Sequence, residues 1–548
     1  MSKQHKQVET AGRLSRRRDG RELAARVGIV FALLAASSAM ADQAWWTGLA
    51  GSAWNAGLTN WDTDATSGTM ASALPSSSTD VFFSTLLPMR KAGSLTLGTD
   101  FSINSLTFTS RDGALSLGDS ARTLTLSGSG GSGITVEGGS ATRSIAADVL
   151  LGAPQTWTNN GATAITTLSV SGDIDATAPG GQLTIAGSGN TSLAGAIGSN
   201  ITGGVVKTGG GVLSLGSNAN SFSGGLTING GVVQATDDRA LGAAGSGVTL
   251  NGGGTLNLEI AGYTEMTLGA GRSITVNGSA SNPSGLEVAG LLTTGAGQLQ
   301  GNGALRISSS YPPSGGTTGE LYVKGANPGF TGQLVIGTGK QLIGDYFSEP
   351  FSSNSVDIIV LLWSTGSLAN SSGITVTQTG TLAISQSGAT VTGRLGSAPL
   401  AFHSGRFTYS TNGNVAINDT FGNVAVTGQW KIVGFTNVTG PAGGTTLNFG
   451  NLNRADHATL LFLDDDLAYG GAPSATSLRV FFANLAPDIT TSGLTRSVIP
   501  WASNAPTSFG APNDLMTYDA NGFRPLNVLT ETTPPSSPDP MCGPRPAR

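Results

Sequence analysis

The sequence predicts an all-β fold in which short strands stack into a β-solenoid. Glycine fills 82 of 548 positions, roughly twice the usual share and without a collagen period, which indicates many turns. Segments such as 212–216 and 226–230 alternate apolar with small polar residues, the period of a half-buried strand. This pattern continues for hundreds of residues, whereas a sandwich ends after about 100. Stacked turns of about 20–25 residues explain it more simply.

Residues 1–41 read as a secretory signal peptide. Basic residues precede a short apolar run at 27–36, and Ala39 and Ala41 then form an Ala-x-Ala pattern. We therefore expect export with cleavage after Ala41. An uncleaved anchor is the alternative, but the apolar run is too short for an ordinary transmembrane helix.

Residues 42–80 form a distinct N-terminal segment that is rich in tryptophan. It holds four of the eight tryptophans, namely Trp45, Trp46, Trp54 and Trp61. One interpretation is a sugar-binding platform, because aromatic faces stack on sugars. The other is a cap over the open first turn, which repeat arrays need. We favour the cap.

The remaining chain divides into a long β-helix, a C-terminal module and a tail. Strand patterns recur over 81–447, and 222–228 matches 330–336 in spacing and residue type. From 448 to 526 charge and larger apolar residues increase, and we expect a β module that continues the solenoid. Residues 527–548 are rich in proline and are expected to be disordered.

Composition excludes some classes of function. Charged residues make up 11% and the formal net charge is −5, so we expect no nucleic-acid partner. Cys542 is the one cysteine, which excludes an intramolecular disulfide.

One segment, at about 204–236, resembles the autotransporter-associated β-strand repeat. It contains Lys207-Thr208-Gly209 followed by Val212-Leu213-Ser214-Leu215, then Asn220, Phe222 and Gly224-Gly225. These residues follow the repeat's Lys-Thr-Gly-x-Gly-x-Leu-x-Leu core and its Asn-x-Phe/Tyr-x-Gly sequel. Gly210 departs from the pattern, since the family often has alanine there. Weaker likenesses lie at 100–108, 154–172, 453–460 and 517–526.

The resemblance implies a right-handed parallel β-helix passenger, secreted or displayed at the bacterial cell surface in association with the outer membrane. Family members often continue into further repeats and a C-terminal β-barrel or sorting signal, whereas this chain ends at Arg548. We therefore expect a truncated or frameshifted product, or a passenger separated from its translocator. Membrane attachment would then use a missing or separate anchor.

The search for chemistry assigns no catalytic, cofactor-binding or metal-binding residue. His457 lies near Asp456 and 464–466, which suggests a metal or acid–base site, but a solvated turn is the favoured interpretation. Asp237-Asp238-Arg239 is expected to be a solvated loop. The glycine-rich stretch 128–133 lacks the Lys-Ser/Thr end of a phosphate loop and is interpreted as a corner.

Two functions remain after this search. The first is a non-enzymatic, adhesin-like solenoid that displays loops for weak multivalent binding to extracellular glycans or other surface proteins, with no small-molecule cofactor. The alternative is a polysaccharide lyase or glycosidase, which needs clustered acidic and basic side chains on neighbouring turns of a groove. Fold analogy alone does not supply that activity.

Overall fold

The computed structural model describes residues 42–66, 68–84, 93–109, 114–162, 165–260, 264–309, 319–337, 358–387, 390–411, 416–436, 444–455, 457–463, 478–485, 499–505 and 514–526. The predicted signal peptide, the proline-rich tail and the aspartates at 464–466 lie outside these residues. The described residues are almost entirely strands and turns, with two short 3₁₀ helices, η1 (Leu58–Asn60) and η2 (Asp238–Leu241). No described helix is long and apolar enough to cross a membrane.

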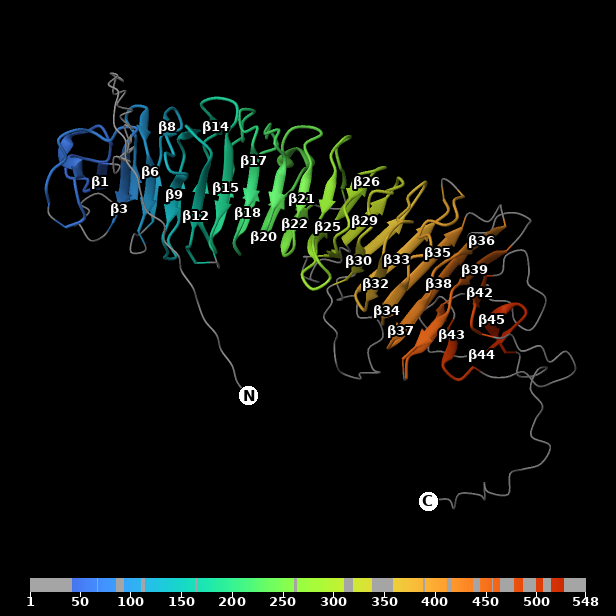
Figure 1. Cartoon of the computed structure of the whole chain (residues 1–548). Coiled ribbons are helices and arrows are strands. Elements are labelled where there is room, and N and C mark those ends of the chain that lie inside the picture. Colours follow the sequence, from blue (N-terminus) through green and yellow to red (C-terminus); the bar gives the residue numbers. More distant parts are fainter. Residues whose placement is uncertain are drawn as a thin grey trace, which may run out of the picture. The chain divides into compact units, whose positions relative to one another are not determined.

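Two large sheets run through most of the described chain (Figure 1). The 12-stranded sheet contains β1 (Asp42–Trp46), β2 (Trp61–Asp62), β3 (Thr79–Phe83), β6 (Ser105–Phe108), β9 (Ser132–Val136), β12 (Gln155–Asn159), β15 (Gln182–Ala186), β17 (Gly204–Lys207), β19 (Leu226–Ile228), β21 (Val248–Leu250), β24 (Ile274–Val276) and β27 (Leu299–Gln300). The 15-stranded sheet contains β4 (Gly93–Leu95), β7 (Leu115–Leu117), β10 (Arg143–Ile145), β13 (Thr166–Val170), β16 (Asn190–Leu193), β18 (Val212–Leu215), β20 (Gly231–Ala235), β22 (Gly254–Glu259), β25 (Ser284–Ala289), β28 (Leu305–Ser308), β30 (Gln333–Ile336), β32 (Gly373–Thr377), β34 (Leu400–His403), β37 (Val424–Thr427) and β40 (Leu452–Arg454).

Three further sheets complete the turns. A four-stranded sheet contains β5 (Phe101–Ile103), β8 (Thr123–Leu126), β11 (Asp148–Leu151) and β14 (Ile174–Ala176). An 11-stranded sheet contains β23 (Glu265–Thr267), β26 (Leu291–Thr294), β29 (Gly319–Val323), β31 (Ile358–Leu362), β33 (Gly380–Ser385), β35 (Arg406–Thr411), β38 (Gln429–Thr436), β41 (Thr459–Leu463), β43 (Ala502–Ala505), β44 (Asp514–Asp519) and β45 (Gly522–Pro525). A three-stranded sheet contains β36 (Ile417–Thr420), β39 (Thr445–Phe449) and β42 (Leu478–Phe482).

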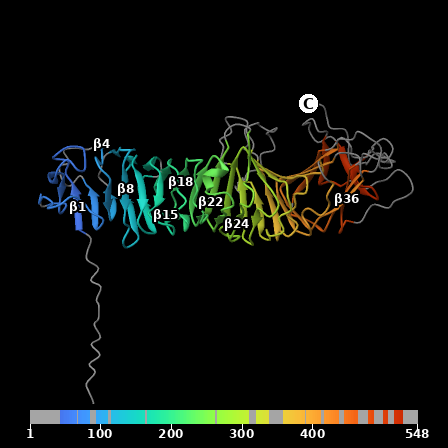
Figure 2. The ribbon, with the colours of Figure 1, turned by 90° about the horizontal axis from the view of Figure 1, so that it is seen from above.

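Between the two ends of the stack the sheets are parallel, and each strand pairs with its counterpart about one turn later. In the 12-stranded sheet, Leu183 pairs with Val205, Val205 with Leu226, and Leu226 with Val248. One turn in this region therefore takes 21 or 22 residues. The same order is visible along the stack in two views (Figures 1 and 2). The predicted β-solenoid is thus confirmed.

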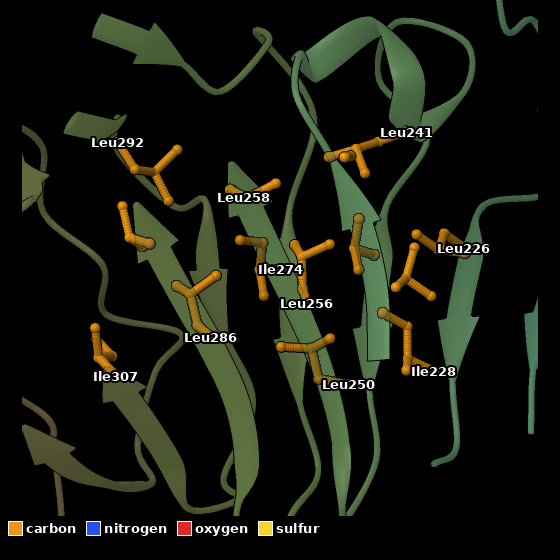
Figure 3. Close-up of a cluster of buried hydrophobic side chains, with 14 of the residues drawn as sticks. Leu226, Ile228, Leu241, Leu250, Leu256, Leu258, Ile274, Leu286, Leu292 and Ile307 are labelled. Carbon is orange, nitrogen blue, oxygen red and sulfur yellow. The ribbon is translucent and has the colours of Figure 1, made fainter. Parts of the chain in front are cut away.

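The core lies between the sheets and follows directly from the alternation in the sequence. Every second residue of a typical strand is buried, as in the pattern of Leu226 and Ile228 on either side of the half-buried Thr227. Side chains from the 12-stranded and 15-stranded sheets meet in the interior (Figure 3), where Leu250 and Leu256 are fully buried. Burial of apolar surface is the main stabilising term for such a stack.

The tryptophan-rich segment packs into the first turns of the stack. Trp46, Trp54 and Trp61 have no exposed surface, and the Trp61 ring lies 5.0 Å from that of Trp46 and 5.3 Å from that of Trp54. Trp45 stacks on Phe82 at 4.4 Å. The buried rings of Trp46, Trp54 and Trp61 have no face available to a sugar.

Antiparallel strands lie at both ends of the described stack. At the first turn β1 pairs with β2 in the antiparallel sense. After the last parallel pairing, β43 to β44 and β44 to β45 are antiparallel. At the end of the 15-stranded sheet, the Asn484 side chain accepts the Leu452 N–H at 2.8 Å and donates to the Leu452 carbonyl at 3.0 Å. These contacts satisfy backbone groups that an open edge would leave for another strand.

Candidate functional surface

The outer face of the 15-stranded sheet carries a ladder of six serines in register. The pairings join one outward serine of each strand to that of the next turn. The ladder comprises Ser94, Ser116, Ser144, Ser169, Ser192 and Ser214. Ser94 is exposed and the other five serines are half-buried. The row continues into Gln234, Asn257 and Glu287, and the Ser214 hydroxyl donates to the Gln234 side chain at 3.1 Å.

The 12-stranded sheet carries a comparable polar surface. Thr227, Thr249 and Thr275 form an outward row in register. Each threonine is followed two residues later, just beyond the end of its strand, by an asparagine: Asn229, Asn251 and Asn277. Their amides are linked in sequence, Asn251 donating to Asn229 at 2.5 Å and Asn277 to Asn251 at 3.0 Å. Apart from Glu287, both rows therefore present uncharged donors and acceptors at the strand spacing of about 4.8 Å.

A groove of about 510 Å³ lies on the outer face of the 15-stranded sheet. Ala401 and Ala425, adjacent on β34 and β37, form part of its lining. Further lining comes from the corners and neighbouring strands, namely Gln333, Ser372, Gly373, Ile374, Thr375, Pro399, Leu400, Asn423, Val424 and Asn453. The groove thus crosses five consecutive strands, from β30 to β40.

The polar groups of this groove are oriented by the strand corners. The Asn423 side-chain oxygen accepts the Asn451 N–H at 2.8 Å. This bond orients the side-chain amide of Asn423, and its NH₂ group does not take part in the bond. Gln333 donates to the Thr375 hydroxyl at 3.4 Å, a weak contact. Ser372 and Asn453 are exposed. None of the lining residues is acidic, basic or histidine.

An aromatic cluster with one ion pair lies on the outer face of the 11-stranded sheet. The rings of Tyr322 and Trp363 meet edge to face at 6.5 Å. The Lys324 ammonium lies 4.9 Å from the Trp363 ring centre and 2.8 Å from a Glu265 carboxylate oxygen. The hydrogen bond from Lys324 lowers the pKa of Glu265, and burial raises the pKa of Tyr322 to about 12. The ring contact, the cation–π contact and the ion pair thus hold these four side chains against one another.

The acidic loop at 237–239 differs from the solvated loop that the sequence predicts. Asp237 caps η2 and pairs with Arg239 at 2.9 Å, which is the expected surface arrangement. Asp238 instead pairs at 2.8 Å with Arg272, whose side chain has no exposed surface. Arg272 also donates to the Leu241 and Ser246 carbonyls at 3.0 and 2.7 Å. Asp238 therefore links its own turn to the turn that carries Arg272. The sequence did not reveal this contact, because the two residues are more than 30 positions apart.

The two described histidines and the glycine-rich stretch 128–133 lie in turns or on a strand surface. His457 is exposed in a turn with φ of 64°, as expected for a solvated turn, while Asp456 lies outside the described residues. His403 contacts the Thr427 hydroxyl on the neighbouring strand. Gly128, Gly130 and Gly131 all have positive φ, which glycine tolerates cheaply, so the stretch is a corner. No cluster of three or more metal-ligating side chains occurs in the described part of the chain.

The enzyme alternative predicts acidic and basic side chains together along a groove, and the groove lining has neither. The ionisable groups of Tyr409, Asp419 and Arg394 also cluster, but they lie in the interior. Tyr409 donates to Asp419 at 3.1 Å, and Gln386 links Tyr409 to Arg394 at 2.6 and 3.3 Å. Burial raises the pKa of Asp419 and lowers that of Arg394. All three ionisable side chains are essentially inaccessible, which suits a buried structural network.

Sequence reasoning predicted strands in which apolar and small polar residues alternate, but it found neither the serine ladder as a row nor the groove. Recurrent Leu-Ser-Leu and Leu-Ser-Val triplets, as at 115–117 and 168–170, were the available signal for the ladder. The groove had no comparable signal, because its lining is spread over residues 333–453.

Comparison with known proteins agrees with this description. The family model of the passenger-associated-transport-repeat matches residues 205–235, which confirms the repeat predicted at about 204–236. The chain is also similar to the adhesin BmaC autotransporter of Brucella suis biovar 1 (strain 1330), with 30% identity over 201 residues. This match covers 33% of the chain and only 6% of the relative's length. No solved structure matches the chain significantly.

The repeat and the stacked parallel strands define a class of protein. The matched residues 205–235 coincide with β17, β18, β19 and β20, which form one complete turn and part of the next. The chain therefore has a β-solenoid fold that contains a segment matching this passenger-associated repeat.

Proposed function

We propose that the chain is a secreted or cell-surface, adhesin-like passenger that binds other surfaces weakly and at many points, without catalysis. The observation that carries this proposal is the serine ladder from Ser94 to Ser214, in which six turns present the same hydroxyl in register. A rigid stack with repeated uncharged groups suits many weak contacts that add through multivalency. The likeness to an autotransporter adhesin supports the same role.

The partners that fit such a surface are extracellular glycans or other surface proteins. The threonine, asparagine and serine rows offer donors and acceptors but little charge, so long-range electrostatic steering contributes little. Affinity would then depend on the number of contacts made at once. Localisation at the bacterial cell surface, in association with the outer membrane, follows from this proposal.

Attachment of protein-coated beads to bacterial and host cells tests the proposal. The purified chain is coated on beads at increasing density, and we expect attachment to rise more steeply than the density, because a single chain binds weakly. The triple variant S144A/S169A/S192A removes three ladder hydroxyls without changing the charge and should lower attachment while leaving the circular dichroism spectrum unchanged. Attachment no greater than that of albumin-coated beads at every density would refute the proposal.

The absence of catalysis is tested separately. The purified chain is incubated with neutral and acidic polysaccharides, and reducing ends and unsaturated products are measured. We expect no product above a buffer control. Cleavage that survives repurification and follows the protein through two columns would replace the adhesin proposal with the polysaccharide-acting enzyme.

A further inference from the structure

The groove on the 15-stranded sheet has features that select one chemical class of ligand. Its lining lacks acidic, basic and histidine side chains across five consecutive strands. An acidic polymer requires cations and a basic peptide requires anions, because charged groups leave water only when they are paired. Two charged side chains border the lining without belonging to it: Arg454, which donates to the Ala458 carbonyl at 2.6 Å and lies 5.2 Å from the Trp501 ring, and the exposed Arg306 on β28, which is in register with Val335 of β30. Arg454 is thus held by the protein itself.

The backbone at the groove is closed to an added strand. Strands β32, β34 and β37 each pair on both sides within the sheet. At β40, the Asn484 side chain occupies both backbone groups of Leu452. A peptide that binds by strand addition needs a free sheet edge, so the side chains must make the contacts in this groove.

Those side chains match the groups of an uncharged sugar. Amides and hydroxyls both donate and accept, as sugar hydroxyls do, and the groove presents them at Ser372, Asn423 and Asn453. Asn423 is already oriented by the bond from the Asn451 N–H. Between these groups, the methyl groups of Ala401 and Ala425 offer a small apolar surface to the C–H face of a sugar ring.

The dimensions of the groove favour a chain of sugars over a single unit. Five strands at about 4.8 Å spacing extend over roughly 19 Å along the stack. The groove volume of about 510 Å³ falls in the range of roughly 300–1,000 Å³ that is typical of ligand sites.

We infer that this groove binds a neutral polysaccharide through the amides and hydroxyls at its corners and the alanine methyls between them. This inference rests on the proposed adhesin function and names one ligand class for it. Residues outside the core carry the binding, so substitutions there separate binding from folding.

Affinity electrophoresis through gels that contain one polysaccharide each tests the inference. The probes are dextran, mannan, galactan and β-1,3-glucan as neutral polymers, with alginate and polygalacturonate as acidic ones. We expect at least one neutral polymer to retard the chain. The Ala425→Trp variant fills the groove and should weaken this binding at least about tenfold, and Asn453→Ala should weaken it about threefold. Thr408→Trp, an outward residue of the 11-stranded sheet, is the matched control and should bind like the unmodified chain.

Several outcomes would overturn the inference. They are retardation by acidic polymers alone, retardation by none, and binding that is equal in Ala425→Trp and the unmodified chain. Circular dichroism of each variant shows whether it is folded, and Ala425→Arg replaces Ala425→Trp if that variant is not. The two assays together distinguish the proposals: cell attachment without retardation by any neutral polymer refutes the groove inference alone, whereas polysaccharide binding without any cell attachment refutes the adhesin function alone.

Discussion

The turns that carry the repeat and the turns near the C-terminus fill their interiors in different ways. From β15 to β21 each turn takes 21 or 22 residues, and the interior is mainly aliphatic, with Val205, Leu213 and Ile228 fully buried. Near the C-terminus three phenylalanines stack across the three-stranded sheet. Phe421 lies 4.8 Å from Phe449, which lies 5.3 Å from Phe482. Beside them is the buried network of Tyr409 and Asp419.

The difference teaches that a solenoid can be uniform in its hydrogen bonding and still vary in its core. Backbone pairing is parallel and in register in both regions. Small aliphatic side chains fit short identical turns, so one sequence motif suffices to describe them. Large rings fill the longer turns near the C-terminus, where each ring must match the rings of its neighbours, because cores are packed as tightly as crystals. We therefore expect damage to spread further in the aromatic region.

The largest effect should come from removing the central contact of the phenylalanine stack. Phe421→Ala leaves a cavity against Phe449 and Phe407 and should cost about 3–5 kcal/mol. Because rings on successive turns share contacts, amide hydrogen exchange should show lost protection in β36, β39 and β42 together. A long array need not unfold in one step, which is why local exchange is the appropriate measurement.

Leu250→Ala in the repeat-bearing region is the control for the phenylalanine variant. It should cost about 2–5 kcal/mol, but the loss of protection should be confined to β21 and the strands next to it. If Phe421→Ala affects a single turn, or if Leu250→Ala affects three, the proposed difference between the regions is wrong.

The sequence predicted the repeat-bearing region better than the aromatic one, for a physical reason. Alternation of leucine with serine or threonine reports burial on one face directly, so β18 and β19 could be located from 212–216 and 226–230. Phe421, Phe449 and Phe482 lie 28 and 33 residues apart and share no motif. Their stacking depends on the register of β36, β39 and β42, which becomes known only when the turns are folded.

The candidate groove was unpredictable for the same reason. Ala401 and Ala425 are ordinary small residues in the sequence, and they form part of one groove only because β34 and β37 are adjacent. Lys207 was recognised as part of the repeat but not as buried. It occupies an inward position in register with Ile185 and Ile228, where its apolar neighbours would have predicted another aliphatic residue.

Lys207 gives the aliphatic region one pH-dependent feature. Its ammonium donates to the Thr208 and Gly209 carbonyls at 2.6 and 3.0 Å and is almost fully buried. Burial lowers the pKa of Lys207 from 10.5 to about 8. Between these two pH values the unfolded chain holds a proton that the folded chain has lost. The free energy of unfolding should therefore rise as pH increases from about 8 towards 10.5, by at most about 3 kcal/mol.

The variant Lys207→Met isolates this effect. It removes the titrating group while filling similar space, so the difference in stability between the unmodified chain and the variant should shift in favour of the unmodified chain as the pH rises from 7 to 10. Local unfolding free energies of β17 and β19, measured by hydrogen exchange at several pH values, provide the test. Val206→Met, a half-buried outward neighbour, should show no such pH trend. A difference that is constant with pH would contradict the assignment.

The smallest effects on stability are expected for alanine substitutions at three consecutive glycines, 209–211, at the corner of the repeat. These substitutions show which of the three positions needs glycine because of the neighbouring backbone. Gly209 has φ of 71°, and a Cβ there would lie 2.4 Å from the Gly187 carbonyl oxygen. A Cβ on Gly211 would lie 2.1 Å from the Gly189 oxygen, whereas one on Gly210 would meet nothing within 4 Å. We expect Gly209→Ala and Gly211→Ala to cost about 1–3 kcal/mol each. Gly210→Ala should stabilise the corner by about 0.4–1 kcal/mol, since alanine restricts the unfolded chain.

Thermal unfolding of the three single variants, together with hydrogen exchange at β17 and β18, measures this ranking. The resemblance to the repeat family already points the same way, because alanine is frequent there at the position of Gly210. The corner geometry explains that frequency: the clash comes from the backbone of the preceding turn, which approaches Gly209 and Gly211 but not the residue between them. Equal destabilisation by all three alanines would mean that the turns are not stacked at the spacing that these distances require.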